Sequence, residues 1–231
     1  MKRKITIAID GFSSTGKSTI AKQLAKQLGY IYVDTGAMYR AVTLYAMQHN
    51  FIDKNHFNVN ALITDLDKIS LKFIYNEQKG FAEMFLNGTN VEEEVRGMAV
   101  SKLVSKIATI SKVRKKLVSQ QQLMGKNKGV VMDGRDIGTV VFKDAELKLF
   151  MTASPEKRAN RRYKELLDRG DNVSYDEILK NVQYRDHIDS TREDSPLIKA
   201  DDAIDFDNSN MGLEEQFERI YNFAVEIIRE K

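Results

Sequence analysis

The 231-residue sequence contains no cysteine, which excludes disulfides, thiolate metal sites and a cysteine nucleophile. It also lacks any apolar run near the roughly 20 residues of a membrane-spanning helix, so we expect no membrane partner. Histidine is scarce: His49, His56 and His187 are scattered without the spacing of a zinc site. These absences are compatible with the cytoplasm, where we expect the protein to reside.

A strong charge of one sign is missing too. Thirty-six basic and 33 acidic residues leave a net charge of +3, too small to indicate a nucleic-acid partner. The hydrophobic fraction of 42% and the charged fraction of 30% are ordinary for a globular protein. The length predicts one large domain, or one domain with a smaller insertion. Because no spare apolar stripe is visible, we expect a monomer.

The first fifty residues alternate between strand and helix patterns. A glycine-rich stretch lies between the first strand and the first helix, and Gly29 follows that helix as a stop signal. This order is the opening of a parallel α/β sheet flanked by helices. The predicted elements are strand 3–10, helix 17–28, strand 30–33 and helix 35–49.

The pattern changes in the stretch KISLKFIYNEQKGFAEMFLNGTNV, residues 68–91, which reads as antiparallel hairpins. We therefore predict a small β insertion over 57–96 within a core formed by 1–56 and 97–231. Helical and strand patterns then resume. The predicted helices are 97–108, 111–125, 155–169, 174–190 and 213 onward, and the strands are 129–133, 147–152 and 203–206.

The stretch GFSSTGKS, residues 11–18, matches the phosphate-binding loop pattern GxxxxGK[ST] between a strand and a helix. Its glycines let the backbone N–H groups turn toward phosphate oxygens, and the helix N-terminus adds a positive dipole end. Lys17 is placed to reach the β and γ phosphates, and the Ser18 hydroxyl is a ligand for Mg²⁺. A tight turn without a ligand is the alternative. The predicted ATP-binding residues are Gly11, Ser13, Ser14, Thr15, Gly16, Lys17, Ser18 and Thr19.

Charged residues follow two other predicted strands. Asp133 ends the strand in VVMDGRD, where a carboxylate can order Mg²⁺ and its waters, and Arg135 and Asp136 come next. A turn in which Arg135 and Asp136 pair with each other is the alternative. After Asp34, Thr35 is expected to cap the following helix, and Arg40 is either a substrate residue or simply solvated.

Arginines gather on two later helices. Arg158, Arg161, Arg162 and Arg169 share a helical face, which indicates a mobile lid over about 155–172 whose charges neutralise a transferring phosphoryl group. Nearby acids leave open a solvated, salt-bridged helix. On the next helix, Arg185, Asp189 and Arg192 share a face that can meet a ribose and a phosphate. Together these features describe phosphoryl transfer by positioning and positive charge.

The chain resembles the bacterial cytidylate kinases, nucleoside monophosphate kinases of the phosphate-loop class, over essentially its whole length. The insertion over 57–96 looks like the enlarged monophosphate-binding insert of these enzymes. The resemblance rests on IAIDGFSSTGKST, DTGAMYRAV, SKIATISKVR, MDGRDIGTVVFKDA, RANRR and YRDHIDSTR. It implies Mg²⁺- and ATP-dependent phosphorylation of CMP and dCMP, with these nucleotides as the partners.

The resemblance also implies residue roles. Arg40, Arg135 and Arg192 would hold the CMP phosphate, and Arg185 and Asp189 would meet the sugar. Ser105, Arg114 and Asp136 would bind the cytosine, whose exocyclic amine can donate to a carboxylate. Thr35 and Tyr39 complete the expected CMP site; relatives also carry Ser where Thr35 stands, and the hydroxyl is kept. The expected catalytic residues are Lys17, Asp133, Arg158 and Arg162.

Three other functions compete with this interpretation. A UMP or AMP kinase would share the loop and the arginines but should lack the insertion and the base-reading set. A regulatory GTPase needs an NKxD motif, and the chain has Asn127-Lys128 without the aspartate. A nucleic-acid-binding module would interleave basic residues with exposed aromatics.

Overall fold

The computed structural model describes residues 3–229, which fold into two compact units. One unit is Asp34–Gln120, and the other comprises the rest of the described chain. The insertion predicted over 57–96 lies within the first of these, whereas its status as a separate domain stays a prediction. Among residues 3–229, no helix combines the length and the apolar character needed to cross a membrane.

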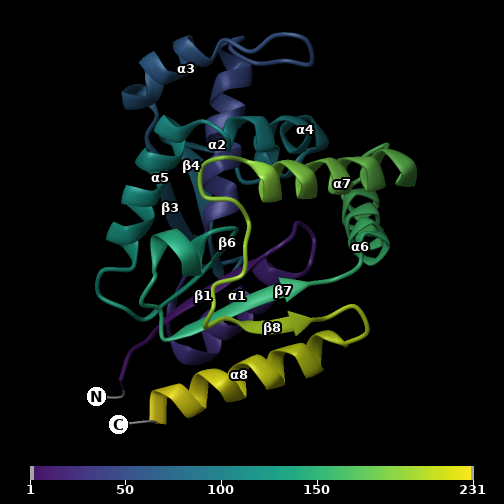
Figure 1. The fold of residues 1–231 in the computed structure, drawn as a ribbon. Coiled ribbons are helices and arrows are strands. Elements are labelled where there is room, and N and C mark those ends of the chain that lie inside the picture. Colours follow the sequence, from purple (N-terminus) through teal and green to yellow (C-terminus); the bar gives the residue numbers. More distant parts are fainter. Residues whose placement is uncertain (1–2, 230–231) are drawn as a thin grey trace. The chain divides into compact units, whose positions relative to one another are not determined.

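A five-stranded sheet of order β2-β6-β1-β7-β8 organises the unit that carries the phosphate-binding loop (Figure 1). The central strand β1 pairs in parallel with β6 and with β7, and β7 pairs in parallel with β8. The predicted parallel α/β fold is therefore confirmed. The bounds are β1 Thr6–Gly11, β2 Ile31–Asp34, β6 Val130–Gly134, β7 Leu147–Thr152 and β8 Ile204–Asp207.

Helices α1 (Lys17–Leu28) and α8 (Leu213–Arg229) pack on this sheet and enclose its core. Ile20, Leu24 and Ile220 are fully buried against β1 and β7, because apolar residues recur at helical spacing on one face of each helix. Burial of a side chain of this size contributes about 1.5–3 kcal/mol. Gly29 ends α1 in the left-handed conformation, as the sequence indicated.

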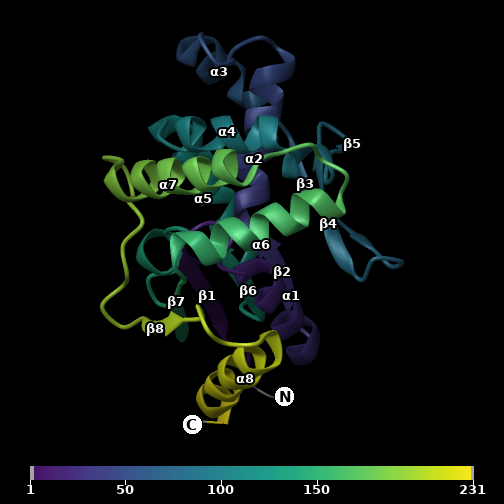
Figure 2. The ribbon, with the colours of Figure 1, turned by 90° about the vertical axis from the view of Figure 1, so that its right-hand side faces the viewer.

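Two helices, α6 and α7, follow β7 and are seen from the side in Figure 2. Helix α6 (Pro155–Asp168) begins at the predicted proline, and the Ser154 hydroxyl caps it by accepting from the Lys157 N–H. Helix α7 (Tyr175–Thr191) begins after Ser174, whose hydroxyl accepts from the Glu177 N–H as expected. Between β6 and β7, the short turn η3 (Ile137–Val141) was not predicted.

The unit Asp34–Gln120 combines helices with a three-stranded antiparallel sheet of order β3-β4-β5. The predicted hairpin is confirmed, with β3 at Leu71–Asn76, β4 at Phe81–Leu86 and β5 at Thr89–Asn90. The helix α3 (Val59–Asp65) was missed. The remaining elements are α2 (Thr35–Gln48), η1 (Leu66–Lys68), η2 (Glu94–Arg96), α4 (Met98–Ile107) and α5 (Ser111–Met124), the last of which crosses the unit boundary.

Helix α2 corrects one expectation about its start. The sequence placed the cap at Thr35, but the Asp34 carboxylate accepts the hydrogen bond from the Ala37 N–H, and Thr35 is the first helical residue. An N-cap side chain must reach an N–H two or three residues ahead, so the cap is the last residue of β2. The helix is buried on almost every side, from Ala37 to Ala46.

Gly11 sets how closely β1 approaches β7. Its φ is +144°, and a Cβ there would lie 2.0 Å from the Met151 carbonyl oxygen. We predict that Gly11→Ala lowers the free energy of unfolding by at least about 3 kcal/mol, because strain and overlap add. The matched control Gly80→Ala, with φ +71° but no atom within 4 Å, should lose about 1 kcal/mol. Urea denaturation measures both, and equal losses would refute the close-approach explanation.

Candidate active site

The phosphate-binding loop joins β1 to α1 through an unusual backbone. Ser14 and Gly16 have φ of +59° and +93°, and the N–H of Thr19 donates back to the Gly16 carbonyl. Thr15 is fully buried, and the buried Ser13 hydroxyl has no hydrogen-bond partner within the described residues. Left-handed residues within the loop, a helix N-terminus and a buried hydroxyl that lacks a partner fit a phosphate ligand.

Lys17 opens α1 with its side chain folded over the loop. Its ammonium donates to the Phe12 carbonyl and to the Thr15 hydroxyl. Burial, and then the positive charge of Arg135, lower the pKa of Lys17 to about 7, against the partial compensation of Asp133 and Asp10. A buried cation pushed toward its neutral form gains from an anion beside it. The environment of Lys17 therefore favours a bound anion.

A carboxylate and a hydroxyl meet beside the loop. The Ser18 hydroxyl donates to Asp133 Oδ2 at 2.9 Å, and the Tyr32 hydroxyl donates to Asp133 Oδ1 at 2.8 Å. Asp133 is buried near the end of β6, next to β1, which explains how residues 115 positions apart come together. Hard oxygen ligands of this kind suit Mg²⁺, so the residues present fit the ion. The contact from Tyr32 was not anticipated.

Arg135 and Asp136 follow β6. Arg135 pairs with a residue of α7 and not with Asp136, as the alternative of a self-paired turn would require. Arg135 Nε donates to Asp189 Oδ2 at 2.9 Å, and its other contact is the Gly134 carbonyl. Asp136 is buried, and its charge is felt at the neighbouring carboxylate of Asp10. The turn is therefore tied to α7 through Arg135, while the carboxylate of Asp136 is buried close to the carboxylate of Asp10.

Asp10 anchors the segment that carries these two residues. Its carboxylate accepts from the backbone N–H groups of Ile137 at 2.8 Å and Gly138 at 2.7 Å. Burial raises the pKa of Asp10 to about 7, although the two N–H donors oppose the rise. Sequence reasoning treated Asp10 only as the end of a strand. Its partners lie 127 and 128 residues away, so no local pattern could have revealed the contact.

Helix α7 and the residue that caps its end carry the predicted cluster of Arg185, Asp189 and Arg192. All three are buried, and Arg192 lies 3.7 Å from Asp189 as an ion pair. Burial, then the charge of Arg135, lowers the pKa of Arg185 to about 10, and Arg162 contributes to the same effect. Burial would raise the pKa of Asp189, but the surrounding arginines hold it below its usual value. The cluster concentrates positive charge, as an anion site requires.

Helix α6 lies against the phosphate-binding loop through its first two arginines. Arg158 is only 2% exposed; it pairs with both oxygens of Asp186, at 2.9 and 2.6 Å, and donates to the Ser13 carbonyl. Arg161 donates to the Thr15 carbonyl at 3.0 Å. Arg158 is therefore not solvated, although its pair with Asp186 agrees with the salt-bridged part of the alternative. Arg162 pairs with Glu165 at 2.7 Å, and the mobile lid stays a prediction.

Asn208 is the residue of this region that sequence reasoning missed most clearly. It directly follows β8, is fully buried, and its side-chain amide donates to the Thr15 carbonyl and to Gln216. Its side-chain and backbone oxygens both accept from Arg161. Asn208 and Arg161 thus hold the same loop carbonyl from two elements. A lone asparagine after a strand has no distinguishing pattern, so only the fold reveals this role.

The other predicted substrate residues belong to the unit Asp34–Gln120. Arg40 donates to the Val95 carbonyl at 3.1 Å, and the Arg114 guanidinium lies over the Tyr39 ring, 5.6 Å from its centroid. Arg114 also donates to the Ala108 carbonyl at the end of α4. Thr35 and Ser105 are buried on α2 and α4. The structure thus brings Tyr39 and Arg114 together within this unit.

Known proteins similar to this chain identify its family. The family model for cytidylate kinase matches residues 7–226. The chain belongs to the cytidylate kinase family. A cytidylate kinase of Flavobacterium johnsoniae is 63% identical over 227 residues, which are 98% of this chain and 99% of that protein. The cytidylate kinase of Parabacteroides distasonis is 59% identical over 214 residues, which are 93% of each chain. That of Bacteroides thetaiotaomicron is 52% identical over 228 residues, which are 99% of this chain and 100% of that protein.

Membership of the cytidylate kinase family confirms the predicted enzyme class, a nucleoside monophosphate kinase. The residues that carried the resemblance divide between the two units. The unit of the phosphate-binding loop contains Lys17, Asp133, Arg135, Asp136, Arg158, Arg162, Arg185, Asp189 and Arg192. The unit Asp34–Gln120 contains Thr35, Tyr39, Arg40, Ser105 and Arg114. Their individual roles stay predictions.

The raised pKa of Asp10 gives a pH test of its anchoring role. Between pH about 4 and 7 the folded protein holds a proton that the unfolded chain, with a pKa of 3.8, has released. Asp10 therefore contributes stability at low pH that is lost as pH rises through about 7, by up to about 1.4 kcal/mol per pH unit. We expect Asp10→Asn to remove this slope from the free energy of unfolding.

Urea titrations of both proteins at several pH values between 4.5 and 7.5 measure that difference. Asp144→Asn, at an exposed position of the following segment, is the matched control and should run parallel to the wild type. A wild type and an Asp10→Asn variant with parallel pH profiles would contradict the assignment.

Proposed function

We propose that the chain transfers the γ-phosphoryl group of ATP to CMP and dCMP, giving ADP with CDP or dCDP, through an anion site built around Lys17, Arg135 and Arg185. The observation that carries the site is the burial of neighbouring cations: burial, and after it the charge of Arg135, lowers the pKa of both Lys17 and Arg185. Burying like charges together costs free energy unless anionic ligands offset it. Two phosphorylated substrates supply that compensation.

The donor would lie along the phosphate-binding loop. Backbone N–H groups between Gly11 and Thr19 receive the phosphates of ATP, and Lys17 leaves its internal carbonyl partner to meet the β and γ phosphates. Ser18 and Asp133, joined by their hydrogen bond, would hold Mg²⁺ and its waters. When bound, Mg²⁺ offsets the negative charge that gathers on the phosphate oxygens during transfer.

The acceptor site follows the family resemblance. Arg40, Arg135 and Arg192 bind the CMP phosphate, and Arg185 and Asp189 bind the sugar. Asp136 accepts from the cytosine amine, assisted by Ser105 and Arg114, while Thr35 and Tyr39 line the site. Uracil presents an acceptor oxygen where cytosine presents its amine, so the buried carboxylate of Asp136 disfavours UMP. The sites of the two phosphates belong to one reaction, in which a CMP phosphate oxygen attacks the γ phosphorus and ADP leaves.

No side chain needs to act as a strong base in this reaction, since a phosphate oxygen is already the nucleophile. The protein contributes alignment and positive charge in a site from which water is excluded. Arg158 and Arg162 stabilise the transferring group when the helical lid closes, which requires Arg158 to exchange a partner such as Asp186 for substrate. We keep the monomeric state and the cytoplasmic location as parts of this proposal.

Base selection by Asp136 predicts the substrate profile. ADP formation from Mg·ATP should be fast with CMP and dCMP and slow with UMP, AMP and GMP. Asp136→Ala should narrow the ratio of kcat/KM between CMP and UMP by at least about tenfold, because the acceptor for the amine is gone. A variant with the full preference for CMP would remove Asp136 from base reading, and a wild type that prefers UMP would overturn the acceptor assignment.

Replacing Lys17 is expected to lower turnover while the protein stays folded. Lys17→Met keeps much of the side-chain volume but removes the charge, so kcat should fall by about 100-fold or more. Since a buried cation is removed, the free energy of unfolding should be unchanged or larger. Coupled-assay kinetics and urea denaturation measure the two effects. A folded Lys17→Met enzyme with wild-type turnover would refute the phosphate-loop interpretation.

A further inference from the structure

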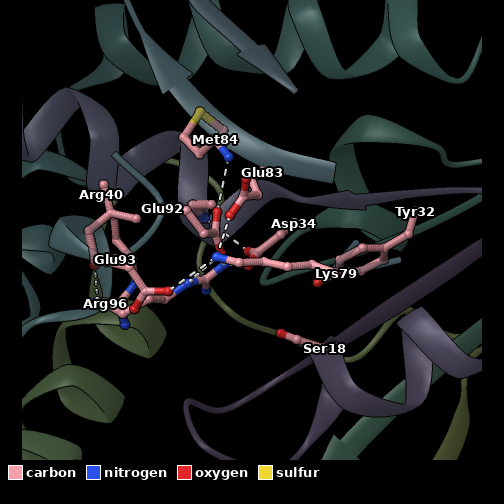
Figure 3. A network of polar contacts seen from close by, with 12 residues as sticks. Ser18, Tyr32, Asp34, Arg40, Lys79, Glu83, Met84, Glu92, Glu93 and Arg96 are labelled. Atoms are coloured by element: carbon pink, nitrogen blue, oxygen red, sulfur yellow. Dashed lines mark hydrogen bonds and ion pairs between the residues drawn. The ribbon is translucent and has the colours of Figure 1, made fainter. Parts of the chain in front are cut away.

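Arg96, to which the family resemblance gives no role, takes part in a polar network with other residues of Asp34–Gln120 (Figure 3). It is the last residue of the short turn η2, and one of its nitrogens contacts two carboxylates. Nη2 lies 2.7 Å from Asp34 Oδ2 and 2.8 Å from Glu92 Oε1, and Nε donates to the same Glu92 oxygen at 3.2 Å. One cation is thus shared between two acidic side chains.

Both carboxylates bind backbone on separate elements. Asp34 caps α2 by accepting from the Ala37 N–H, and the second oxygen of Glu92 accepts from the Met84 N–H of β4 at 3.0 Å. Burial would raise the pKa of Asp34, but the charge of Arg96 and the Ala37 N–H hold it below its usual value. Arg96 therefore joins three elements: the start of α2, strand β4 and the turn η2.

The charges around Arg96 indicate that it holds the protein structure together and does not bind a phosphate itself. Two carboxylates within 2.8 Å offset the positive charge of this guanidinium, so little of it is left to attract a phosphate. Breaking a partly buried pair of this kind leaves a carboxylate without compensation, so the arrangement is strongly held. Any effect of Arg96 on substrate binding must therefore act through the residues that the turn η2 holds in place.

The turn η2 positions Arg40. Val95, the residue before Arg96, is fully buried, and its carbonyl accepts from Arg40 Nη1 at 3.1 Å. Arg40 projects from α2, the helix that Asp34 caps. The ion pair with Asp34 fixes the turn against the start of this helix, and the carbonyl of Val95 then fixes the direction of the guanidinium of Arg40. Both contacts with α2 come from two consecutive residues of η2.

We propose that Arg96 is a positioning residue for the CMP phosphate: by binding Asp34 and Glu92 it holds the Val95 carbonyl that aims Arg40. The proposal rests on the role of Arg40 in the proposed function. It predicts an effect confined to the acceptor substrate, since no member of this set belongs to the phosphate-binding loop. A misplaced phosphate ligand weakens CMP binding and alignment, and leaves the affinity for ATP nearly unchanged.

The test compares Arg96→Met, Arg40→Met and the double variant in steady-state kinetics with CMP and ATP varied separately. We expect Arg96→Met to raise the KM for CMP by about tenfold and to change the KM for ATP by less than about twofold. Arg96→Lys, which keeps a cation, should recover part of the loss. In the Arg40→Met background, Arg96→Met should have little further effect, because the ligand that it positions is gone.

Two further variants keep the test independent of folding. Glu92→Gln retains an acceptor for the Met84 N–H while weakening the pair with Arg96, and should raise the KM for CMP by a smaller factor. Arg219→Met removes an exposed Arg–Glu pair on α8 and should match the wild type in both KM values. Thermal unfolding of each variant measures the contribution of stability alone.

The outcomes separate the two hypotheses. Suppose that Arg40→Met raises the KM for CMP, and that adding Arg96→Met to it raises this KM further by the same factor as in the wild type. Arg96 then acts independently of Arg40 and the positioning role is wrong, while the proposed function stands. Equal changes in both KM values for Arg96→Met and Glu92→Gln would overturn it as well, in favour of general destabilisation. If Arg40→Met leaves the KM for CMP unchanged, the role assigned to Arg40 fails, and the positioning role of Arg96 fails with it.

Discussion

The accumulation of buried positive charge beside the phosphate-binding loop is the constraint on which the rest of the structure depends. Lys17, Arg135 and Arg185 come from three segments far apart in sequence, yet burial and the charge of Arg135 lower the pKa of both Lys17 and Arg185, and the charge of Arg185 also lowers that of Lys17. Like charges at such positions repel, so folding must fix them against their mutual preference to separate. Much of the remaining site can be understood as the framework that keeps them in place until anionic substrates arrive.

That framework uses carboxylates and backbone carbonyls in different ways. Asp189 meets Arg135 and Arg192 directly and lowers the electrostatic cost of the cluster. Asp10 accepts from two backbone N–H groups and thereby fixes the segment after β6. Arg158 and Arg161 are turned toward the carbonyls of Ser13 and Thr15, so their cationic ends stiffen the loop. Arginine suits this work because its planar, permanently charged group donates in several directions at once.

Patterns local in the chain made most of the fold predictable from the sequence. Helical spacing and Gly29 gave α1 with the bounds that the structure has, and the turn-rich stretch around residues 76–80 gave the β3–β4 hairpin. The loop GFSSTGKS was identifiable because its physics is contained in eight consecutive residues. The cap of α2 was misplaced by one residue, since Asp34 and Thr35 are both good capping residues and only the backbone decides between them.

The contacts that escaped prediction join distant residues of ordinary type. Asn208 reaches Thr15 across 193 positions, and Tyr32 reaches Asp133 across 101, which no spacing rule covers. The arginines show the same limit in another form. Sequence gives Arg96, Arg158 and Arg185 the same charge, but the first two form ion pairs with Asp34 and Asp186, whereas burial and the charge of Arg135 outweigh the nearby carboxylates and lower the pKa of Arg185. Whether an arginine holds the framework or is left to face an anion is therefore a property of its neighbours, and the proposed phosphoryl transfer by alignment needs both kinds.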